Sequence, residues 1–365
     1  MIPALAIAEQ LVDRGRSPRS VAFVASRRPV DARLLDGTDH PRLLLNVDGL
    51  QRSLAPKAVL RSLAALPKLL IATAIATRQL RLWRPRVVVS VGGFASEPAV
   101  RAARALRIPI VVVSYDQHPG LATRRQAKHA AGVAVAFANS KLPGAKHTGA
   151  PVRNDVRRLG RNTAADGEAR QRAAQKFGLD PKRRIVVAMG GSLGSQTINT
   201  AVERWAATQS HRDDVAVLHL VGDRFINDAP HPDASMLSAS GTSGLQYVRR
   251  ASHAHMADIW LLADVVICRA GASTIAELVA VGSAAVVVPW AGSADDHQRS
   301  NARWLSDAGA AIVVEEHEIA SRFASEVSRV LDDAVVRERL AAKSYALGAL
   351  NRSSAIGSLI EAAAR

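Results

Sequence analysis

Two glycine turns in the second half of the sequence have the residue types of a phosphate-binding site. In each, an apolar run typical of a buried parallel strand ends at glycine, and a helix-forming segment follows. The first turn, 190–195, contains Ser192, and the second, 270–274, contains Ser273 and Thr274. Backbone N–H groups at the start of a helix, where its dipole is positive, can bind phosphate. Two such turns at one sheet edge could hold a diphosphate without a metal ligand or a lysine.

Two polar side chains follow strand ends at positions suited to binding a sugar. Glu277 comes about one helical turn after the second glycine turn, and its carboxylate could accept hydrogen bonds from a ribose diol. Gln298, in the run Asp296-His297-Gln298, follows an apolar strand and could bind sugar hydroxyls. The alternative is an ordinary capped helix with a solvated Glu277 and a solvated loop before Gln298.

Other site chemistries are not indicated. Neither turn is a P-loop or a complete GxGxxG fingerprint, and nucleophilic catalysis by a serine is not indicated. His253 and His255 have no metal-ligand companions at helical spacing, so we interpret them as surface residues. Cys268 is the only cysteine and falls in an apolar strand, which argues against disulfides and a cysteine zinc site.

The charge of the chain is concentrated in its first half. Residues 1–150 carry 23 Lys and Arg against 8 Asp and Glu, out of a net charge of +16 for all 365 residues. The segment 52–86 has no acidic residue and places basic side chains among apolar ones, including Arg78, Arg81, Trp83 and Arg84. It is either a helix packed on the sheet with a solvated basic face or a surface that docks on anionic lipid. Nucleic-acid binding is disfavoured because aromatic residues do not alternate with the basic ones.

The apolar patterning predicts strands alternating with helices in two successive blocks. In the first block we expect helices at 3–13 and 98–106 and strands at 21–25, 43–47, 87–91, 110–114 and 133–137. In the second block we expect strands at 185–189, 215–221, 245–248, 265–268 and 284–288, and helices at 196–207, 256–262 and 298–308. Such blocks form doubly wound parallel sheets that bind ligands at the carboxyl ends of their strands. We therefore expect an α/β protein with domains 1–152 and 153–340 and a terminal helix in 341–365 that packs back on the first domain. The apolar run 69–77 is too short to span a bilayer, no secretion signal is predicted, and the cysteine usage fits a reducing cytoplasm.

Five motifs, spread in order over nearly the whole chain, together resemble the bacterial MurG family. They are Gly92-Gly93-Phe94, Gly149-Ala150-Pro151-Val152-Arg153, Gly190-Gly191-Ser192-x-Gly, Cys268-Arg269-Ala270-Gly271-Ala272-Ser273-Thr274-Ile275-Ala276-Glu277 and Asp296-His297-Gln298-x-x-Asn301-Ala302. The family consists of GT-B glycosyltransferases with two Rossmann-like domains facing a cleft. By this resemblance the chain moves GlcNAc from UDP-GlcNAc, with inversion, to lipid I (undecaprenyl-pyrophosphoryl-MurNAc-pentapeptide), forming lipid II for peptidoglycan.

The resemblance also implies roles for particular residues. Ser192 and the loop Ala272, Ser273, Thr274, Ile275, Ala276 and Glu277 would bind the diphosphate and ribose. Arg153 would reach the nucleotide, the backbone near His253 would meet the uracil, and Gln298 would bind the GlcNAc hydroxyls. Gly92, Gly93, Gln117 and His118 would lie on the acceptor side of the cleft. No cofactor and no metal in the donor site are expected, and the basic segment would hold the protein at the cytoplasmic face of the cell membrane.

The first half departs from the family pattern at two places. The family has a strand and a GGTGGH turn, with its proposed base histidine, directly before a helix that reads like 3–9, and this sequence begins at Met1 inside that helix. We expect an upstream start codon, and we expect that without the strand its two neighbours stay unpaired and the first domain is poorly folded or inactive. The family's HEQN motif is replaced by Tyr115-Asp116-Gln117-His118, which leaves the catalytic base unassigned, with His118 as a candidate.

Two other functions stay open on these residues. One is a GT-B transferase with a different lipid or glycan acceptor, because the acceptor half is where the sequence diverges. The other is a catalytically inactive, membrane-docked protein that binds nucleotide sugars.

Overall fold

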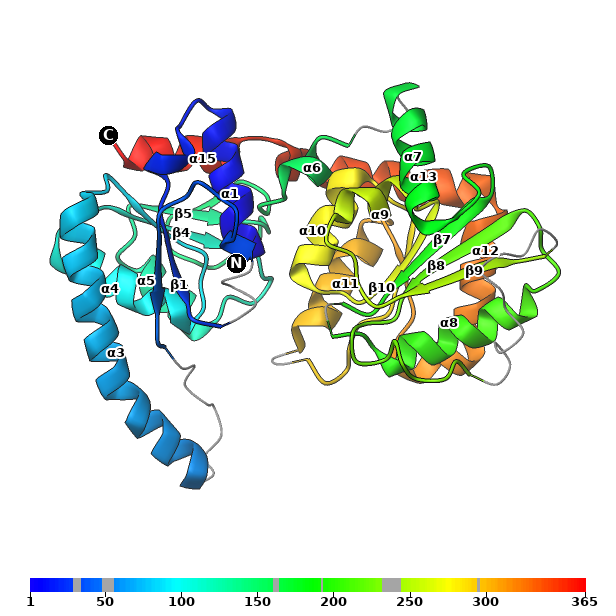
Figure 1. The fold of residues 1–365 in the computed structure, drawn as a ribbon, viewed down its shortest axis with the longest axis horizontal. Coiled ribbons are helices and arrows are strands. Elements are labelled where there is room, and N and C mark those ends of the chain that lie inside the picture. The colour runs from blue at the N-terminus through cyan, green and yellow to red at the C-terminus, as the bar shows by residue number, and fades with distance from the viewer. Residues whose placement is uncertain (29–33, 48–55, 160–163, 192, 232–243, 294–295) are drawn as a thin grey trace. The chain divides into compact units, whose positions relative to one another are not determined.

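The computed structural model describes residues 1–28, 34–47, 56–159, 164–191, 193–231, 244–293 and 296–365. The chain forms two compact units, one of Met1–Asn154 with Ser353–Arg365 and the other of Asp155–Arg352 (Figure 1). The first boundary lies two residues beyond the predicted one. The terminal segment divides at Ser353, so that α13 (Ala334–Leu347) lies in the second unit and α15 (Ala355–Ala363) in the first.

The second unit is built on one six-stranded parallel sheet. Its strands lie in the order β12-β11-β10-β7-β8-β9. The side chains of Ile185 to Ala188 and Val265 to Cys268 are fully buried, so helices cover both faces of the sheet, as the unbroken apolar runs predict. The strands are β7 (Arg184–Met189), β8 (Val215–Leu220), β9 (Gln246–Arg250), β10 (Val265–Cys268), β11 (Ala285–Val287) and β12 (Ile312–Val313).

The helices of this unit follow the strands in the predicted alternation. Trp205 of α8 donates its indole N–H to Ser328 of α12 at 3.0 Å, and both helices pack in one apolar cluster on the sheet. The polar segment 154–184 holds two helices that were not predicted, α6 and α7. The helices are α6 (Asn154–Arg157), α7 (Ala164–Phe177), α8 (Gln196–Thr208), α9 (Met256–Leu262), α10 (Ala272–Val281), α11 (His297–Asp307), α12 (Ala324–Asp332) and α14 (Ala349–Arg352).

The strand order places a topological switch point between β7 and β10. From β7 the chain runs outward through β8 to β9, returns to β10 beside β7, and then runs outward in the other direction through β11 to β12. In open α/β sheets, the loops that leave two such neighbouring strands diverge and form a crevice at their carboxyl ends. Both predicted glycine turns leave the sheet at this point.

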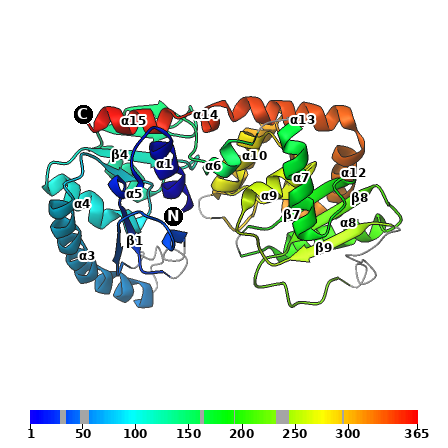
Figure 2. The same ribbon diagram turned by 45° about the horizontal axis from the view of Figure 1, so that its top comes forward.

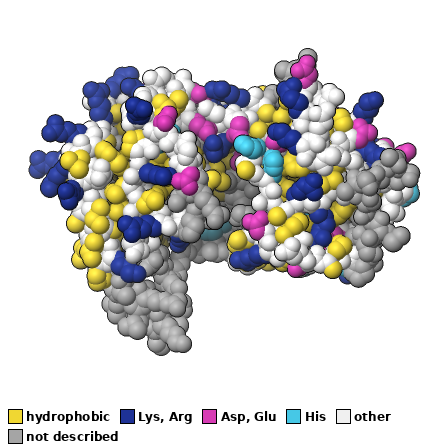
Figure 3. Space-filling model, in the orientation of Figure 1, with side chains coloured by type: hydrophobic (Ala, Val, Ile, Leu, Met, Phe, Trp, Pro, Cys, Tyr) yellow, Lys and Arg dark blue, Asp and Glu magenta, His cyan; other side chains and the backbone are white. Residues whose placement is uncertain are grey.

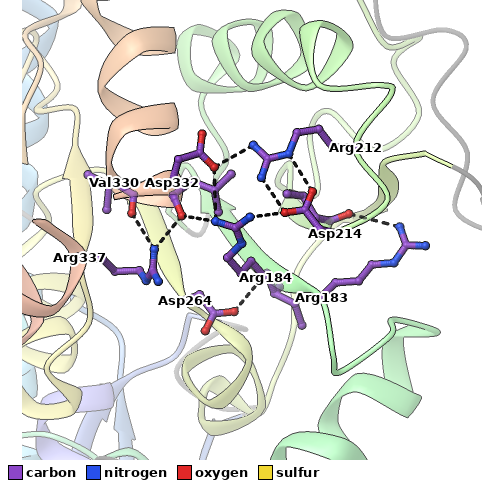
Figure 4. A network of polar contacts seen from close by, with 11 residues as sticks. Arg183, Arg184, Arg212, Asp214, Asp264, Val330, Asp332 and Arg337 are labelled. Atoms are coloured by element: carbon purple, nitrogen blue, oxygen red, sulfur yellow. Dashed lines mark hydrogen bonds and ion pairs between the residues drawn. The ribbon is translucent and has the colours of Figure 1, made fainter. Parts of the chain in front are cut away.

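The opposite end of this sheet is closed by arginines and aspartates (Figure 4). Arg212 bonds Asp214 at 2.8 Å and Asp332 at 2.9 Å, and Arg184, at the start of β7, also pairs with Asp214. Hydrogen bonds from Arg212 and then Arg184 hold the pKa of Asp214 well below its usual range, against the effect of burial. Because these charges pair with one another, we assign this end of the sheet a role in stability and not in ligand binding.

The first unit is built on parallel strands with helices, as predicted, and its described strands form two separate sheets. One sheet pairs β1 (Phe23–Ser26) with β2 (Arg42–Leu45). The other has the order β3-β4-β5-β6, with β3 (Val88–Ser90), β4 (Ile110–Ser114), β5 (Gly132–Val135) and the unpredicted β6 (Ala145–His147). The helices are α1 (Ile2–Asp13), α3 (Pro56–Trp83), α4 (Glu97–Ala105), α5 (Leu121–Ala127) and α15, which lies beside α1 (Figure 2).

A cavity of about 710 Å³ lies between the two sheets of this unit. Residues of β1 line it on one side and residues of β3 on the other, with Ala4, Ile7 and Leu11 of α1 also in its wall. Helix α1 takes part in the packing of both sheets, because its Ile7 lies in one apolar cluster with Val111 of β4 and its Leu5 lies in another with Phe23 of β1. Among the described residues β1 and β3 do not pair with each other, as we expected from the resemblance.

Candidate functional site

The loop after β7 is fixed by a contact between two glycine backbones. Gly194 and Gly222 both have positive φ, +75° and +94°, and a Cβ atom on Gly222 would lie 2.4 Å from the Cα of Gly194. Only glycine fits such a contact without a shift of the backbone. Ser195 then caps α8 by accepting a hydrogen bond from the N–H of Ile198 at 3.4 Å. Ser192 lies outside the described residues.

The loop after β10 presents an uncapped helix start. Gly271 is the N-cap of α10 and, as far as the chain is described, no side chain caps this helix. The N–H of Ile275 donates to the carbonyl of Gly271 at 2.9 Å and so makes the first hydrogen bond within the helix. The first-turn amides that lie before that bond are those of Ala272, Ser273 and Thr274. These three groups are therefore placed to bind an anion, while the side chains of Ile275 and Ala276 are buried.

Arg269, a buried residue for which we predicted no role, joins these two loops to the loop after β11. Arg269 donates to the Oγ atom of Ser195 at 2.7 Å and to the carbonyl oxygens of Val288 and Pro289 at 3.2 and 3.3 Å. It also forms an ion pair of 2.7 Å with Glu316, which accepts the N–H of Ala291 at 3.2 Å. The ends of β7, β10 and β11 are thus held together by one side chain.

The carboxylate of Glu277 is held by a residue on the preceding helix. Glu277 is 9% exposed, and its Oε2 atom accepts the indole N–H of Trp260 at 2.8 Å. Trp260 lies in α9 and is 2% exposed. The apolar pattern of α9 predicts a buried face at this position, but a pattern does not indicate which polar group the indole meets.

Gln298 lies in the first turn of α11, close to the loops of the crevice. Its Oε1 atom accepts the backbone N–H of Trp290 at 3.0 Å, which fixes the orientation of the amide. Three residues later, Asn301 donates to the carbonyl of Ala270 at 3.1 Å and ties α11 to the loop after β10. Gln298 and Glu277 therefore belong to elements that meet at the carboxyl end of β10.

His253 lies just before α9 and has a protein partner. Its Nε2 atom is 3.0 Å from Asp258, which also binds Lys176 at 2.8 Å, and its ring packs edge-on against Phe177. His253 is half-buried, so its interpretation as a surface residue is only partly correct. Within the described ranges no three His, Cys, Asp or Glu residues are grouped so that they could hold a metal ion.

The remaining predicted residues belong to the first unit. Gly92 and Gly93 follow β3 with positive φ, +83° and +79°. Gln117 donates to the Oδ1 atom of Asn139 at 3.3 Å, and His118 beside it is exposed. Arg153 forms an ion pair of 2.6 Å with Glu9, on α1. The structure gives these residues local partners within the first unit, and their roles toward substrates stay predictions.

Helix α3 has one buried and one exposed face along its described part. Leu69, Ala72, Ala76 and Leu80 face the core, at the spacing of one helical stripe. On the exposed side, apolar and basic residues stand next to each other, and Figure 3 shows yellow and dark blue side chains together over this part of the first unit. The exposed residues are Leu70 (66%), Ile71 (62%), Ile75 (45%), Leu82 (68%), Arg78, Arg81 and, just after the helix, Arg84, with Trp83 half-buried between the last two. No helix in the described ranges combines the length and apolar composition that a bilayer span requires.

Comparison with known proteins gives the same family for both halves of the chain. Residues 1–135 match the glycosyltransferase family 28 N-terminal domain, and residues 185–356 match its C-terminal domain. A UDP-N-acetylglucosamine--N-acetylmuramyl-(pentapeptide) pyrophosphoryl-undecaprenol N-acetylglucosamine transferase of Paenarthrobacter aurescens (strain TC1) is 34% identical, over 98% of this chain and 91% of the relative. An enzyme of the same name from Alkalilimnicola ehrlichii (strain ATCC BAA-1101 / DSM 17681 / MLHE-1) is also 34% identical, over 95% and 91%. The crystal structure of Acinetobacter baumannii MurG matches with a TM-score of 0.70 and 25% identity, over 99% of this chain and 95% of that one.

Proposed function

The chain belongs to the MurG family of GT-B glycosyltransferases, and on that premise we propose that it transfers GlcNAc from UDP-GlcNAc to lipid I to form lipid II. The observation that carries this proposal is the 34% identity to a transferase of that name over 98% of the chain. The switch-point crevice, with an uncapped helix start, a buried carboxylate and an oriented amide, supports a nucleotide-sugar donor in the second unit.

In the proposed reaction, the C4 hydroxyl oxygen of the muramyl unit attacks the anomeric carbon of GlcNAc. The new glycosidic bond forms as the bond from that carbon to the diphosphate oxygen breaks, which inverts the anomeric configuration. The hydroxyl proton passes to a base, and UDP leaves with the bonding electron pair. The first-turn amides of α10 would stabilise the charge that develops on the departing diphosphate. This charge stabilisation needs no metal in the donor site, so we expect chelators to leave the rate unchanged.

We assign the parts of the donor to the residues of the crevice. The amides of Ala272, Ser273 and Thr274 would bind the diphosphate together with the loop at Ser192, and Glu277 would accept hydrogen bonds from the ribose diol. Because Trp290 already donates to the Oε1 atom of Gln298, the Nε2 end of that amide is the one we assign to the GlcNAc hydroxyls. We assign the uracil to the backbone near His253 and the rest of the nucleotide contact to Arg153. The acceptor side is assigned to Gly92, Gly93, Gln117 and His118.

The donor assignment is tested by changing Glu277→Ala and measuring UDP-GlcNAc affinity by calorimetry. We expect affinity to fall at least tenfold, or about 1.4 kcal/mol, because the ribose loses a charged acceptor. Glu326→Ala is the matched control, since Glu326 lies on α12, pairs with Arg322 and Arg329, and has no assigned role in the donor site. Equal affinity of Glu277→Ala and the control would refute the assignment.

We further propose that the exposed face of α3 docks the protein on the anionic cytoplasmic surface of the cell membrane, where lipid I would be available. Leu70, Ile71 and Leu82 would enter the interface while Arg78, Arg81 and Arg84 contact lipid head groups, each contributing about 1 kcal/mol. Replacing these three arginines by glutamine should reduce binding to vesicles of phosphatidylglycerol and phosphatidylethanolamine. Replacing Arg322, Arg329 and Arg337 of the second unit is the control, and equal vesicle binding by both triple variants would contradict the proposal.

A further inference from the structure

The only hydrogen-bond donor of the Trp260 side chain is bonded to Glu277. An indole has one N–H group and no acceptor, and here that group meets the Oε2 atom of Glu277 at 2.8 Å. Both side chains are at least nine-tenths buried. A buried carboxylate is costly unless it is hydrogen-bonded, so this hydrogen bond offsets part of the cost of burying Glu277.

The contact restricts the direction in which the carboxylate points. A glutamate side chain has several freely rotating bonds, and a free carboxylate would lose that freedom when it binds a ligand. Trp260 removes much of the freedom beforehand, since its ring is packed in the core and its N–H has a fixed direction. A carboxylate has about four acceptor sites, so accepting one indole N–H is compatible with accepting hydroxyl groups as well.

We propose that Trp260 is a positioning residue that orients Glu277 toward the ribose diol and thereby sets the preference of the site for ribonucleotide over deoxyribonucleotide donors. This inference rests on the proposed function, in which Glu277 accepts from the ribose. It goes beyond that assignment because it attributes part of the nucleotide specificity to a residue that does not touch the donor. The preference follows from preorganisation: a carboxylate that already points at the diol binds it at a smaller entropic cost.

The test compares two ligands in one variant. Trp260→Phe keeps an aromatic ring in the core and removes the N–H. By calorimetry we expect the variant to bind UDP about tenfold more weakly than the unaltered chain, equivalent to 1.4 kcal/mol, and to bind 2′,3′-dideoxy-UDP with unchanged affinity. The ratio of the two affinities is the readout, because a loss of correctly folded protein affects both ligands equally.

Trp205→Phe is the matched control. Trp205 is 1% exposed, and its indole donates to Ser328 at 3.0 Å, so the substitution removes the same atoms from the same unit without touching Glu277. We expect it to leave the ratio unchanged.

Glu277→Ala separates the assignment of Glu277 to the ribose from the inference about Trp260. If Glu277→Ala keeps the preference for UDP over the dideoxy ligand, the ribose assignment is wrong and the inference is overturned with it. If Glu277→Ala loses the preference while Trp260→Phe keeps it, or if Trp260→Phe weakens both ligands equally, only the inference about Trp260 is overturned.

Discussion

Removing Arg269 should destabilise the second unit and weaken the proposed anion site at the same time. The Arg269→Met variant loses the hydrogen bond to Ser195, those to the carbonyls of Val288 and Pro289, and the ion pair with Glu316. Breaking a fully buried pair by removing one partner costs about 3–5 kcal/mol. The Arg269 side chain is 9% exposed and that of Glu316 is 24% exposed. Because water can reach the glutamate that is left behind, we expect the free energy of unfolding to fall by about 2–4 kcal/mol.

Urea unfolding followed by tryptophan fluorescence measures this loss. Four of the five tryptophans lie in the second unit, so the signal reports mainly on that unit. A double-mutant cycle with Glu316→Gln separates the ion pair from the other bonds. We expect a coupling energy of about 1–3 kcal/mol, because the double variant leaves no unpaired buried charge. UDP affinity should also fall in Arg269→Met, since Ser195 and the loop after β10 lose their common support.

Two outcomes would refute this reasoning. An unchanged urea midpoint for Arg269→Met would mean that the three loop ends do not depend on the arginine. A coupling energy near zero would mean that Arg269 and Glu316 act independently, and the loss would then have to be assigned to the bonds with Ser195 and the two carbonyls.

Three further predictions follow from the packing of each unit. Burial lowers the pKa of His219 from 6.5 to about 3, so the unfolded chain takes up a proton below pH 6.5 that the folded chain does not. Between pH 7 and pH 5 the free energy of unfolding should therefore fall by about 2 kcal/mol more in the unaltered chain than in His219→Gln. Equal losses in the two proteins would contradict this prediction. Burial also raises the pKa of the Cys268 thiol to about 12, so a thiol reagent at pH 8 should label Cys268 only at the rate of unfolding, and rapid labelling of the folded protein would show the strand to be accessible. Adding an apolar strand and a glycine turn before Met1 should fill the cavity between β1 and β3 and slow amide exchange in both strands. The same extension with prolines in the added strand is the control. Equal amide exchange in the two extended proteins would count against strand insertion.

The elements of the second unit could be predicted closely because local and tertiary requirements agree there. The expected bounds of β10 (Val265–Cys268) and α9 (Met256–Leu262) match the structure, and each remaining predicted strand or helix of this unit is found within one or two residues at each end. Continuous apolar runs mark buried parallel strands, and glycine marks their ends. β12 was missed because two residues give no periodicity, and α7 because its polar sequence resembles a linker.

The division of the first sheet could be expected only in part. Each strand is readable from its own residues, but whether two strands pair depends on what lies between them, which local pattern does not contain. The expectation that β1 and β3 stay unpaired came from the sequence resemblance, and the separation of the two strands agrees with it. The sequence of 52–86 likewise indicates the basic and apolar character of α3. Which of its apolar residues are exposed, namely Leu70, Ile71, Ile75 and Leu82, depends on how the opposite face packs.

The donor site shows the same limit at the level of single side chains. The glycine turns, Glu277 and Gln298 could be proposed because ligand binding imposes residue types at fixed distances from strand ends. Arg269 and Trp260 could not be given roles in the same way, because their partners, Ser195 and Glu277, are 74 and 17 residues away in the chain. What these two residues do follows from the switch point, where β10 lies beside β7 and the loops after both strands come within reach of one guanidinium. Residues that meet a ligand can thus be proposed from spacing, while the residues that hold them in place become visible only once the strand order is known.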